Sequence, residues 1–201
     1  MDKIKPFSIS NLVSYLALLL AWISILLLIN GRFHLSLGTA LVAFIADTFD
    51  GFLARRFKQE SEFGRQLDSF VDAFIYLIYP SLVFYLHFKL QDLTSVVILY
   101  IFVLAGVFRL VRFNIVGYVG EKTKMGYPGL PVVFSYLTIF SVSVISLAIS
   151  GLSLRLASWL LIILQSSLMI GTFAFPKPQR IWPIVTFLLL IALYMFYLGL
   201  K

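Results

Sequence analysis

The sequence lacks cysteine and has little charge. None of its 201 residues is cysteine, which excludes disulfides and thiol chemistry and leaves the redox compartment undetermined. Only two histidines are present, and both lie far from the acidic residues discussed below, so zinc is not expected. Charged residues make up 12% of the chain, against about 25% in ordinary soluble domains. This shortage of charge excludes an ordinary soluble surface.

Apolar sequence takes the place of the missing charge, at 61% of the residues. Runs of near 20 apolar residues recur, each long enough to cross a hydrocarbon core of roughly 30 Å as a helix. Only helices satisfy their backbone groups locally inside lipid. The sequence therefore predicts an all-α, polytopic transmembrane helical bundle, a single domain over residues 1–201. Seven spans are predicted at 11–29, 35–56, 65–88, 93–115, 130–150, 154–174 and 181–199, although Pro183 leaves an interfacial helix as the alternative for the last.

The positive charge lies between the predicted spans. The net charge is +7, but no basic cluster marks a soluble domain, so the expected partners are anionic lipid headgroups and phosphates rather than nucleic acid. With the N-terminus in the cytosol, all Lys and Arg fall on the cytosolic side except Arg32, Lys89, Arg155 and Lys201. The sequence therefore predicts an integral protein of the cell membrane with a cytosolic N-terminus.

Four acidic residues lie at the cytosolic ends of the second and third predicted spans: Asp47, Asp50, Asp68 and Asp72. Helical spacing places the first two on one face and the last two on another, so a hairpin can direct all four into one cleft. Unpaired, they would repel one another and be driven toward protonation. Mg²⁺, Mn²⁺ or Ca²⁺ removes this conflict, because hard divalent cations take carboxylate oxygens. The alternative is four solvated aspartates at frayed helix ends.

Small residues share these helix faces: Gly51, Ala54 and Gly64. They either leave space for a bulkier group to approach the backbone or serve as close-packing residues between helices. Arg55, at the end of the second span, can pair with an acid or hold a phosphate. Acids, metals and an arginine at a membrane surface favour a phosphate-bearing substrate, and a diphosphate bridged by two metals fits best.

The spacing of these residues resembles the signature of the CDP-alcohol phosphatidyltransferase family: Asp47-x2-Asp50-Gly51-x2-Ala54-Arg55-x8-Gly64-x3-Asp68-x3-Asp72. The resemblance implies a six-helix core, here with one extra C-terminal span. It implies a polar cavity open to the cytosol, in which a CDP-linked lipid binds and an alcohol displaces CMP. Members of the family are often dimeric, so a homodimer is expected.

The resemblance also implies a role for each signature position. The first three aspartates (Asp47, Asp50 and Asp68) would hold two divalent metals on the diphosphate. Asp72 would be the general base for the acceptor hydroxyl and would also touch the second metal. The three small residues would make room for the cytidine nucleotide, and Arg55 would contact the phosphates.

A second stretch, FRLVRFNIVGYVGEKTKMGYPGLP at residues 108–131, resembles the phosphatidylserine synthases of the same family, as does LDSFVD at 67–72. The resemblance implies L-serine as the acceptor and CDP-diacylglycerol or CDP-archaeol as the donor. A serine carboxylate needs a cation, and Arg109, Arg112 and Asn114 can bind it at the inside end of the fourth span. The two arginines are i, i+3 neighbours and can face one site, or they are ordinary positive-inside anchors.

Two other functions remain open at this point. The same chemistry with glycerol phosphate or inositol phosphate as the acceptor would require a denser basic pocket than serine does. A cation transporter could use the four aspartates as an ion pathway. Transport sites usually lie near the bilayer midplane, however, whereas these acids gather at one side of the membrane.

Overall fold

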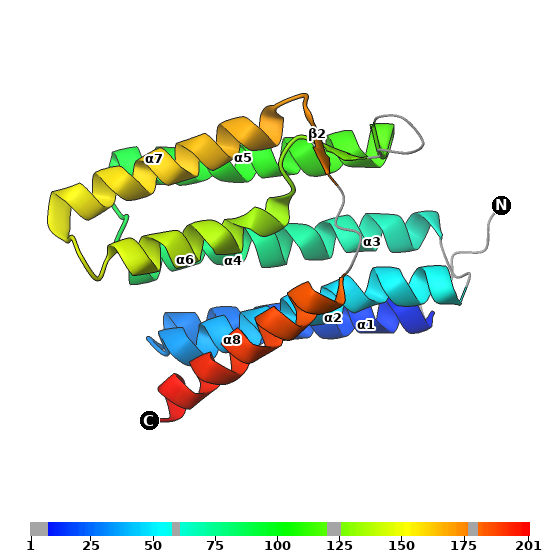
Figure 1. The fold of residues 1–201 in the computed structure, drawn as a ribbon, viewed down its shortest axis with the longest axis horizontal. Coiled ribbons are helices and arrows are strands. Elements are labelled where there is room, and N and C mark those ends of the chain that lie inside the picture. Colours follow the sequence, from blue (N-terminus) through cyan, green and yellow to red (C-terminus); the bar gives the residue numbers. More distant parts are fainter. Residues whose placement is uncertain (1–7, 58–60, 120–125, 177–180) are drawn as a thin grey trace. The chain divides into compact units, whose positions relative to one another are not determined.

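A computed structural model describes residues 8–57, 61–119, 126–176 and 181–201, and these residues are almost entirely helical (Figure 1). The chain divides into two compact units. The first comprises Met1–Ile75 and Arg180–Lys201, and the second comprises Tyr76–Gln179. Each is described below by itself.

The first unit is built on a long antiparallel pair, α1 (Ile9–Ile29) and α2 (Phe33–Arg56), which lie side by side in Figure 1. The third helix, α3 (Glu62–Ala73), contacts both. The C-terminal helix, α8 (Trp182–Leu200), crosses α2. Glycine permits this close crossing, because a Cβ atom on Gly199 would lie 2.6 Å from a side-chain carbon of Leu35.

The third predicted span is one helical segment, Glu62–His87, but it is not a uniform α-helix. After α3 it contains a π-helical turn at Phe74–Ile78, the short α4 (Tyr79–Leu82) and a second π-helical turn at Val83–His87. Pro80 lies between the two π-helical turns. Proline has no N–H to donate to the preceding turn, and π-helical turns accommodate such interruptions.

The second unit packs α5 (Leu93–Val116) against α7 (Gly151–Ile170), with α6 (Ser135–Ile145) beside α7. A short 3-10 helix, Val132–Phe134, precedes α6. Two short strands, β1 (Gly126–Pro128) and β2 (Ala174–Pro176), pair antiparallel near the ends of α5 and α7. The core of this unit includes Phe102, Ile139 and Ile162, all fully buried.

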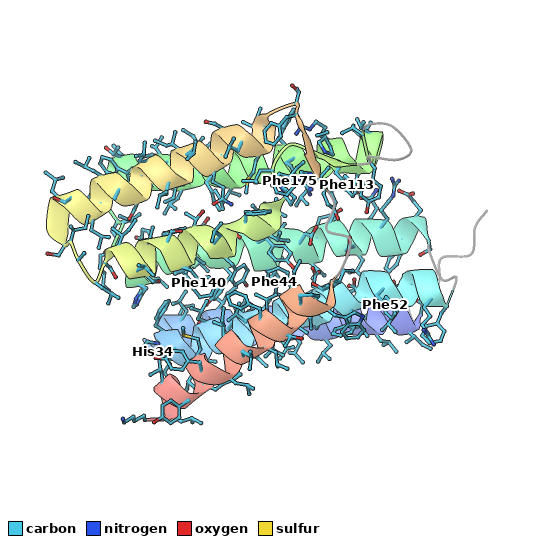
Figure 2. All side chains as sticks on the ribbon, viewed as in Figure 1. His34, Phe44, Phe52, Phe113, Phe140 and Phe175 are labelled. Atoms are coloured by element: carbon cyan, nitrogen blue, oxygen red, sulfur yellow. The ribbon has the colours of Figure 1, made fainter. Side chains whose placement is uncertain are left out.

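Six helical segments of the described residues are long and apolar enough to cross a membrane, which confirms the all-α polytopic prediction. Figure 2 shows side chains projecting from the helices along their whole length. Large apolar side chains such as Trp22, Leu160 and Phe187 are exposed, as expected for surfaces that contact lipid. The chain is therefore an integral membrane protein. The C-terminal helix, Trp182–Leu200, is among the six.

The predicted fifth span, 130–150, is shorter than expected. Its helical residues are Val132–Ile145, and at 1.5 Å per residue they extend about 21 Å, less than a hydrocarbon core of roughly 30 Å. Pro131 adopts an extended conformation and delays the start of the helix. At the other end, the chain turns after Ser146, so the apolar residues that follow do not extend the helix.

Candidate active site

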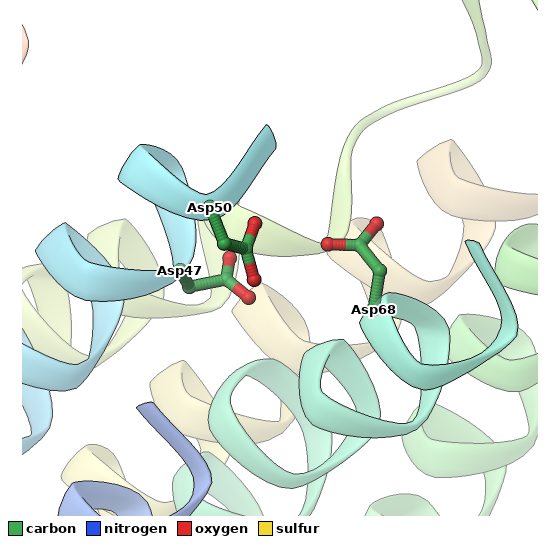
Figure 3. A group of neighbouring side chains, drawn as sticks. All are labelled: Asp47, Asp50 and Asp68. Atoms are coloured by element: carbon green, nitrogen blue, oxygen red, sulfur yellow. The ribbon is translucent and has the colours of Figure 1, made fainter. Parts of the chain in front are cut away.

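Three aspartates from two helices of the first unit come together in the structure. Asp47 and Asp50 lie three residues apart on α2, and Asp68 projects from α3. One carboxylate oxygen from each lies within 4.8 Å of the others. Figure 3 shows the Asp47 and Asp50 carboxylates side by side, with that of Asp68 facing them. We call these residues the aspartate triad.

The triad is shielded from solvent. Asp50 is only 3% exposed, Oδ1 of Asp47 is buried, and Asp68 is partly buried. Three carboxylates held this close repel one another, and burial increases the cost of their charge. Oxygen ligands of Mg²⁺ and Ca²⁺ lie about 2.0 to 2.6 Å from the ion, so two ligands of one ion are separated by at most about 5 Å. The spacing and the all-oxygen chemistry of the triad therefore fit a hard divalent cation.

Asp72 lies outside the triad although it shares a helix face with Asp68. Four residues advance an α-helix by about 6 Å, so the two carboxylates leave the helix at different heights. Asp72 is partly buried. Its predicted contact with a metal ion stays a prediction.

The small residues of the signature lie near the triad in sequence, and one of them has a packing role. Gly51 and Ala54 are partly buried on α2. A Cβ atom on Gly64 would lie 3.1 Å from Oδ1 of Asn11 on α1, tighter than an ordinary contact. Gly64 thus lies against the side chain of Asn11 on α1, and its role in making room for the nucleotide stays a prediction. The side chain of Arg55 lies outside the described part of the structure, as do residues 120–125 of the predicted acceptor segment.

Arg112, in the second unit, is held by backbone carbonyls. Its guanidinium donates to the carbonyl oxygens of Met169, Ile170 and Gly171 at the end of α7, at 3.0, 2.8 and 2.8 Å. It also donates to the carbonyl oxygen of Pro128, at 2.7 Å. The last carbonyls of a helix have no partner within the helix, and an arginine nearby also favours the negative end of the helix dipole. Arg112 therefore ties β1 to the end of α7.

Arg109 has different surroundings from Arg112. It is 4% exposed, and its guanidinium carbon lies 5.2 Å from the centre of the Phe113 ring and 5.5 Å from that of Tyr127. Rings at this distance stabilise a cation through their faces. Asn114, on the last turn of α5, is partly buried. The serine-binding role of all three polar residues, Arg109, Arg112 and Asn114, stays a prediction.

Two residues of α1 contact the site, of which Asn11 was predicted from the sequence to be either an N-cap or a cavity polar group and Ser14 was not identified. Ser14 is 4% exposed, and its hydroxyl donates to Oδ2 of Asp50 at 2.5 Å. Asn11 is 2% exposed and faces Gly64. One signal was available: Ser10, Asn11 and Ser14 are polar residues at helical spacing near the start of an apolar run.

Comparison with known proteins agrees with the resemblance seen in the sequence. The family model described as CDP-alcohol phosphatidyltransferase matches residues 7–200. An archaetidylserine synthase from Methanothermobacter thermautotrophicus is 27% identical over 178 residues, covering 87% of this chain and 72% of that protein. A CDP-diacylglycerol–serine O-phosphatidyltransferase from Methanocaldococcus jannaschii is 28% identical over 179 residues, covering 89% of this chain and 79% of that protein.

Proposed function

This chain belongs to the CDP-alcohol phosphatidyltransferase family, and we propose that it transfers the phosphatidyl or archaetidyl group of a CDP-linked lipid to L-serine, releasing CMP. The acceptor rests on one observation: both relatives described above are named for the transfer to serine or for its product. One relative is named for archaetidylserine and the other for a CDP-diacylglycerol donor, so CDP-archaeol and CDP-diacylglycerol are both candidate donors.

The aspartate triad supports the reaction class. Asp47, Asp50 and Asp68 would hold the divalent cations, and Asp72 would contribute to binding the second ion. We propose two ions, Mg²⁺ or Mn²⁺, with Ca²⁺ as a further candidate. Such ions, when bound, neutralise negative charge on the phosphoryl oxygens of a diphosphate. The triad itself provides a preformed set of oxygen ligands on two helices, so little reorganisation is needed for binding.

The chain's own residues would act on the acceptor. The serine hydroxyl oxygen forms a bond to the lipid-bearing phosphorus, and the bond from that phosphorus to the bridging oxygen of CMP breaks. CMP leaves with the electron pair, and the hydroxyl proton passes to the Asp72 carboxylate. Asp72 suits this role because it lies one helical turn beyond Asp68 on the same face of α3, next to the candidate metal site. The displacement is direct and requires no enzyme nucleophile.

We assign the serine carboxylate to Arg109. Its guanidinium is buried and lies near two aromatic rings, which hold a cation in a defined orientation. The guanidinium of Arg112 donates to four backbone carbonyl oxygens, and Arg112 remains a second candidate for the serine carboxylate. Asn114 lies five residues beyond Arg109 and would add a polar contact to the same substrate.

The second helix carries residues that would bind the CDP-linked donor. Gly51 and Ala54 on α2 and Gly64 on α3 would leave room for the cytidine nucleotide, while Arg55 would contact its phosphates. The distribution of lysine and arginine along the chain supports a protein of the cell membrane whose active site lies on the cytosolic side. We also propose that the protein works as a homodimer.

The decisive experiment is a panel of acceptors. Purified protein is incubated with CDP-diacylglycerol or CDP-archaeol, Mn²⁺ or Mg²⁺, and either L-serine, glycerol phosphate or inositol phosphate, and CMP release is measured. We expect release with serine only, and loss of release when the metal is chelated. CMP release with a phosphorylated polyol but not with serine would refute the acceptor assignment. Metal-independent release would refute the role of the triad.

A further inference from the structure

A hydroxyl group from a helix outside the signature contacts the aspartate triad. Ser14, on α1, donates a hydrogen bond to Oδ2 of Asp50 at 2.5 Å, and both residues are buried. The two residues are 36 positions apart in the sequence. A hydrogen bond to an ionised acceptor is about twice as strong as a neutral one, so this contact is a stabilising one.

The contact departs from the usual behaviour of serine in an apolar helix. The hydroxyl of such a serine usually donates a hydrogen bond to the backbone carbonyl oxygen three or four residues earlier. Ser24, on the same helix, does so by donating to the carbonyl oxygen of Ala21 at 2.7 Å. Ser14 has a similar acceptor in the carbonyl of Ser10, but at 3.2 Å, whereas Asp50 lies at 2.5 Å. Because a hydroxyl carries one hydrogen, the closer, charged acceptor is favoured.

The same helix also contacts the other helix that carries a triad residue. Asn11 lies one turn before Ser14, is 2% exposed and approaches Gly64 on α3. The N-cap of α1 is Ser8, whose side chain accepts a hydrogen bond from the backbone N–H of Asn11. Through these contacts, α1 holds the acid-bearing ends of α2 and α3.

We propose that Ser14 is a positioning residue for Asp50, an inference that rests on the metal site of the proposed function. A carboxylate rotates about a broad, two-fold torsion, so an unsupported Asp50 would sample several orientations. The Ser14 hydroxyl donates to Oδ2 and holds the carboxylate plane in one orientation, in which the aspartate triad can bind a divalent cation. Loss of such a supporting hydrogen bond typically weakens metal affinity about 10- to 100-fold.

The test compares three variants of the full-length protein. Ser14→Ala removes the hydroxyl, Ser14→Thr retains it, and Ser24→Ala removes an equally buried hydroxyl of the same helix that points to its own backbone. Mn²⁺ binding is measured without substrates, from the electron paramagnetic resonance signal of the free ion. The Mn²⁺ dependence of CMP release and the KM for serine are measured alongside.

We expect Ser14→Ala to raise the Kd for Mn²⁺ about 10- to 100-fold. The KM for serine should stay unchanged, and Ser14→Thr and Ser24→Ala should bind Mn²⁺ like the wild type. Wild-type affinity in Ser14→Ala overturns the inference, as does an equal loss in Ser24→Ala or a wild-type protein that binds no Mn²⁺. The binding measurement needs no turnover, so a protein that binds Mn²⁺ but releases no CMP with serine refutes the proposed function alone.

Discussion

Replacing Arg112 by alanine removes four hydrogen bonds that tie β1 to the end of α7. Three of them go to partly buried carbonyl oxygens, those of Pro128, Met169 and Gly171. At about 1 kcal/mol for each buried acceptor left without a donor, the loss amounts to about 3 kcal/mol. For a chain of this size, that loss lowers the melting temperature by about 6 to 12 °C.

The melting temperature can be followed in detergent by the intrinsic fluorescence of the tryptophans. Arg112→Lys should recover only part of the loss, because an ammonium group cannot reproduce the planar fork that reaches four acceptors. The neighbouring variant Arg109→Ala provides the contrast. It should raise the KM for serine about 10- to 100-fold, the equivalent of one charged hydrogen bond of about 1.5 to 3 kcal/mol.

A specific result would refute this reasoning. If Arg112→Ala has the same melting temperature as the wild type and instead raises the KM for serine, the guanidinium of Arg112 binds substrate and its contacts with the carbonyl oxygens do not stabilise the fold. If Arg109→Ala leaves the KM for serine unchanged, the carboxylate of the acceptor is bound elsewhere. The two variants therefore separate support of the fold from binding of the substrate at positions three residues apart on one helix.

Three further predictions concern other parts of the chain. Asp72→Asn should lower CMP release about 100- to 10,000-fold while the protein stays folded, and normal turnover would exclude it as the general base. Gly106→Ala should cost about 1 to 3 kcal/mol of unfolding free energy in a melting assay, because its Cβ would lie 2.2 Å from a carbon of the fully buried Leu77. The hydrogen bond from Ser95 lowers the pKa of Asp92 below its ordinary value of 3.8. The ionised carboxylate therefore stabilises the fold fully at pH values above 3.8, and this stabilisation is lost as the pH falls through the lowered pKa. The melting temperatures of wild type and Asp92→Asn should therefore converge as the pH falls below the lowered pKa, and a constant difference would contradict the prediction.

Local sequence patterns predicted much of the fold. The long apolar runs indicated where the helices lie, because a helix in lipid satisfies its own backbone groups without any partner. The interruptions were less predictable. The fifth helix ends early at Ile145, since the length of a helix depends on the turns that enclose it as well as on apolar composition. The π-helical turns beside Pro80 likewise gave no signal beyond the proline itself.

The candidate site shows the same division between local and long-range information. The spacing of Asp47 and Asp50 indicated a shared face of α2, and that of Asp68 and Asp72 a shared face of α3. Spacing alone did not show which carboxylates meet. The packing of α2 against α3 brings Asp68 to the triad, while the axial rise of the helix places Asp72 one turn further on.

The sequence by itself therefore determined the membrane class, the positions of the helices and the chemistry of the acidic signature. These properties depend on residue type and on helical periodicity, which are local. Only the tertiary structure decided that Ser14 supports Asp50, that Asn11 fills the space beside Gly64, and that Arg112 binds backbone carbonyls. Such contacts join residues far apart in the chain, and they arise when helices pack, because packing selects which polar groups must find a buried partner.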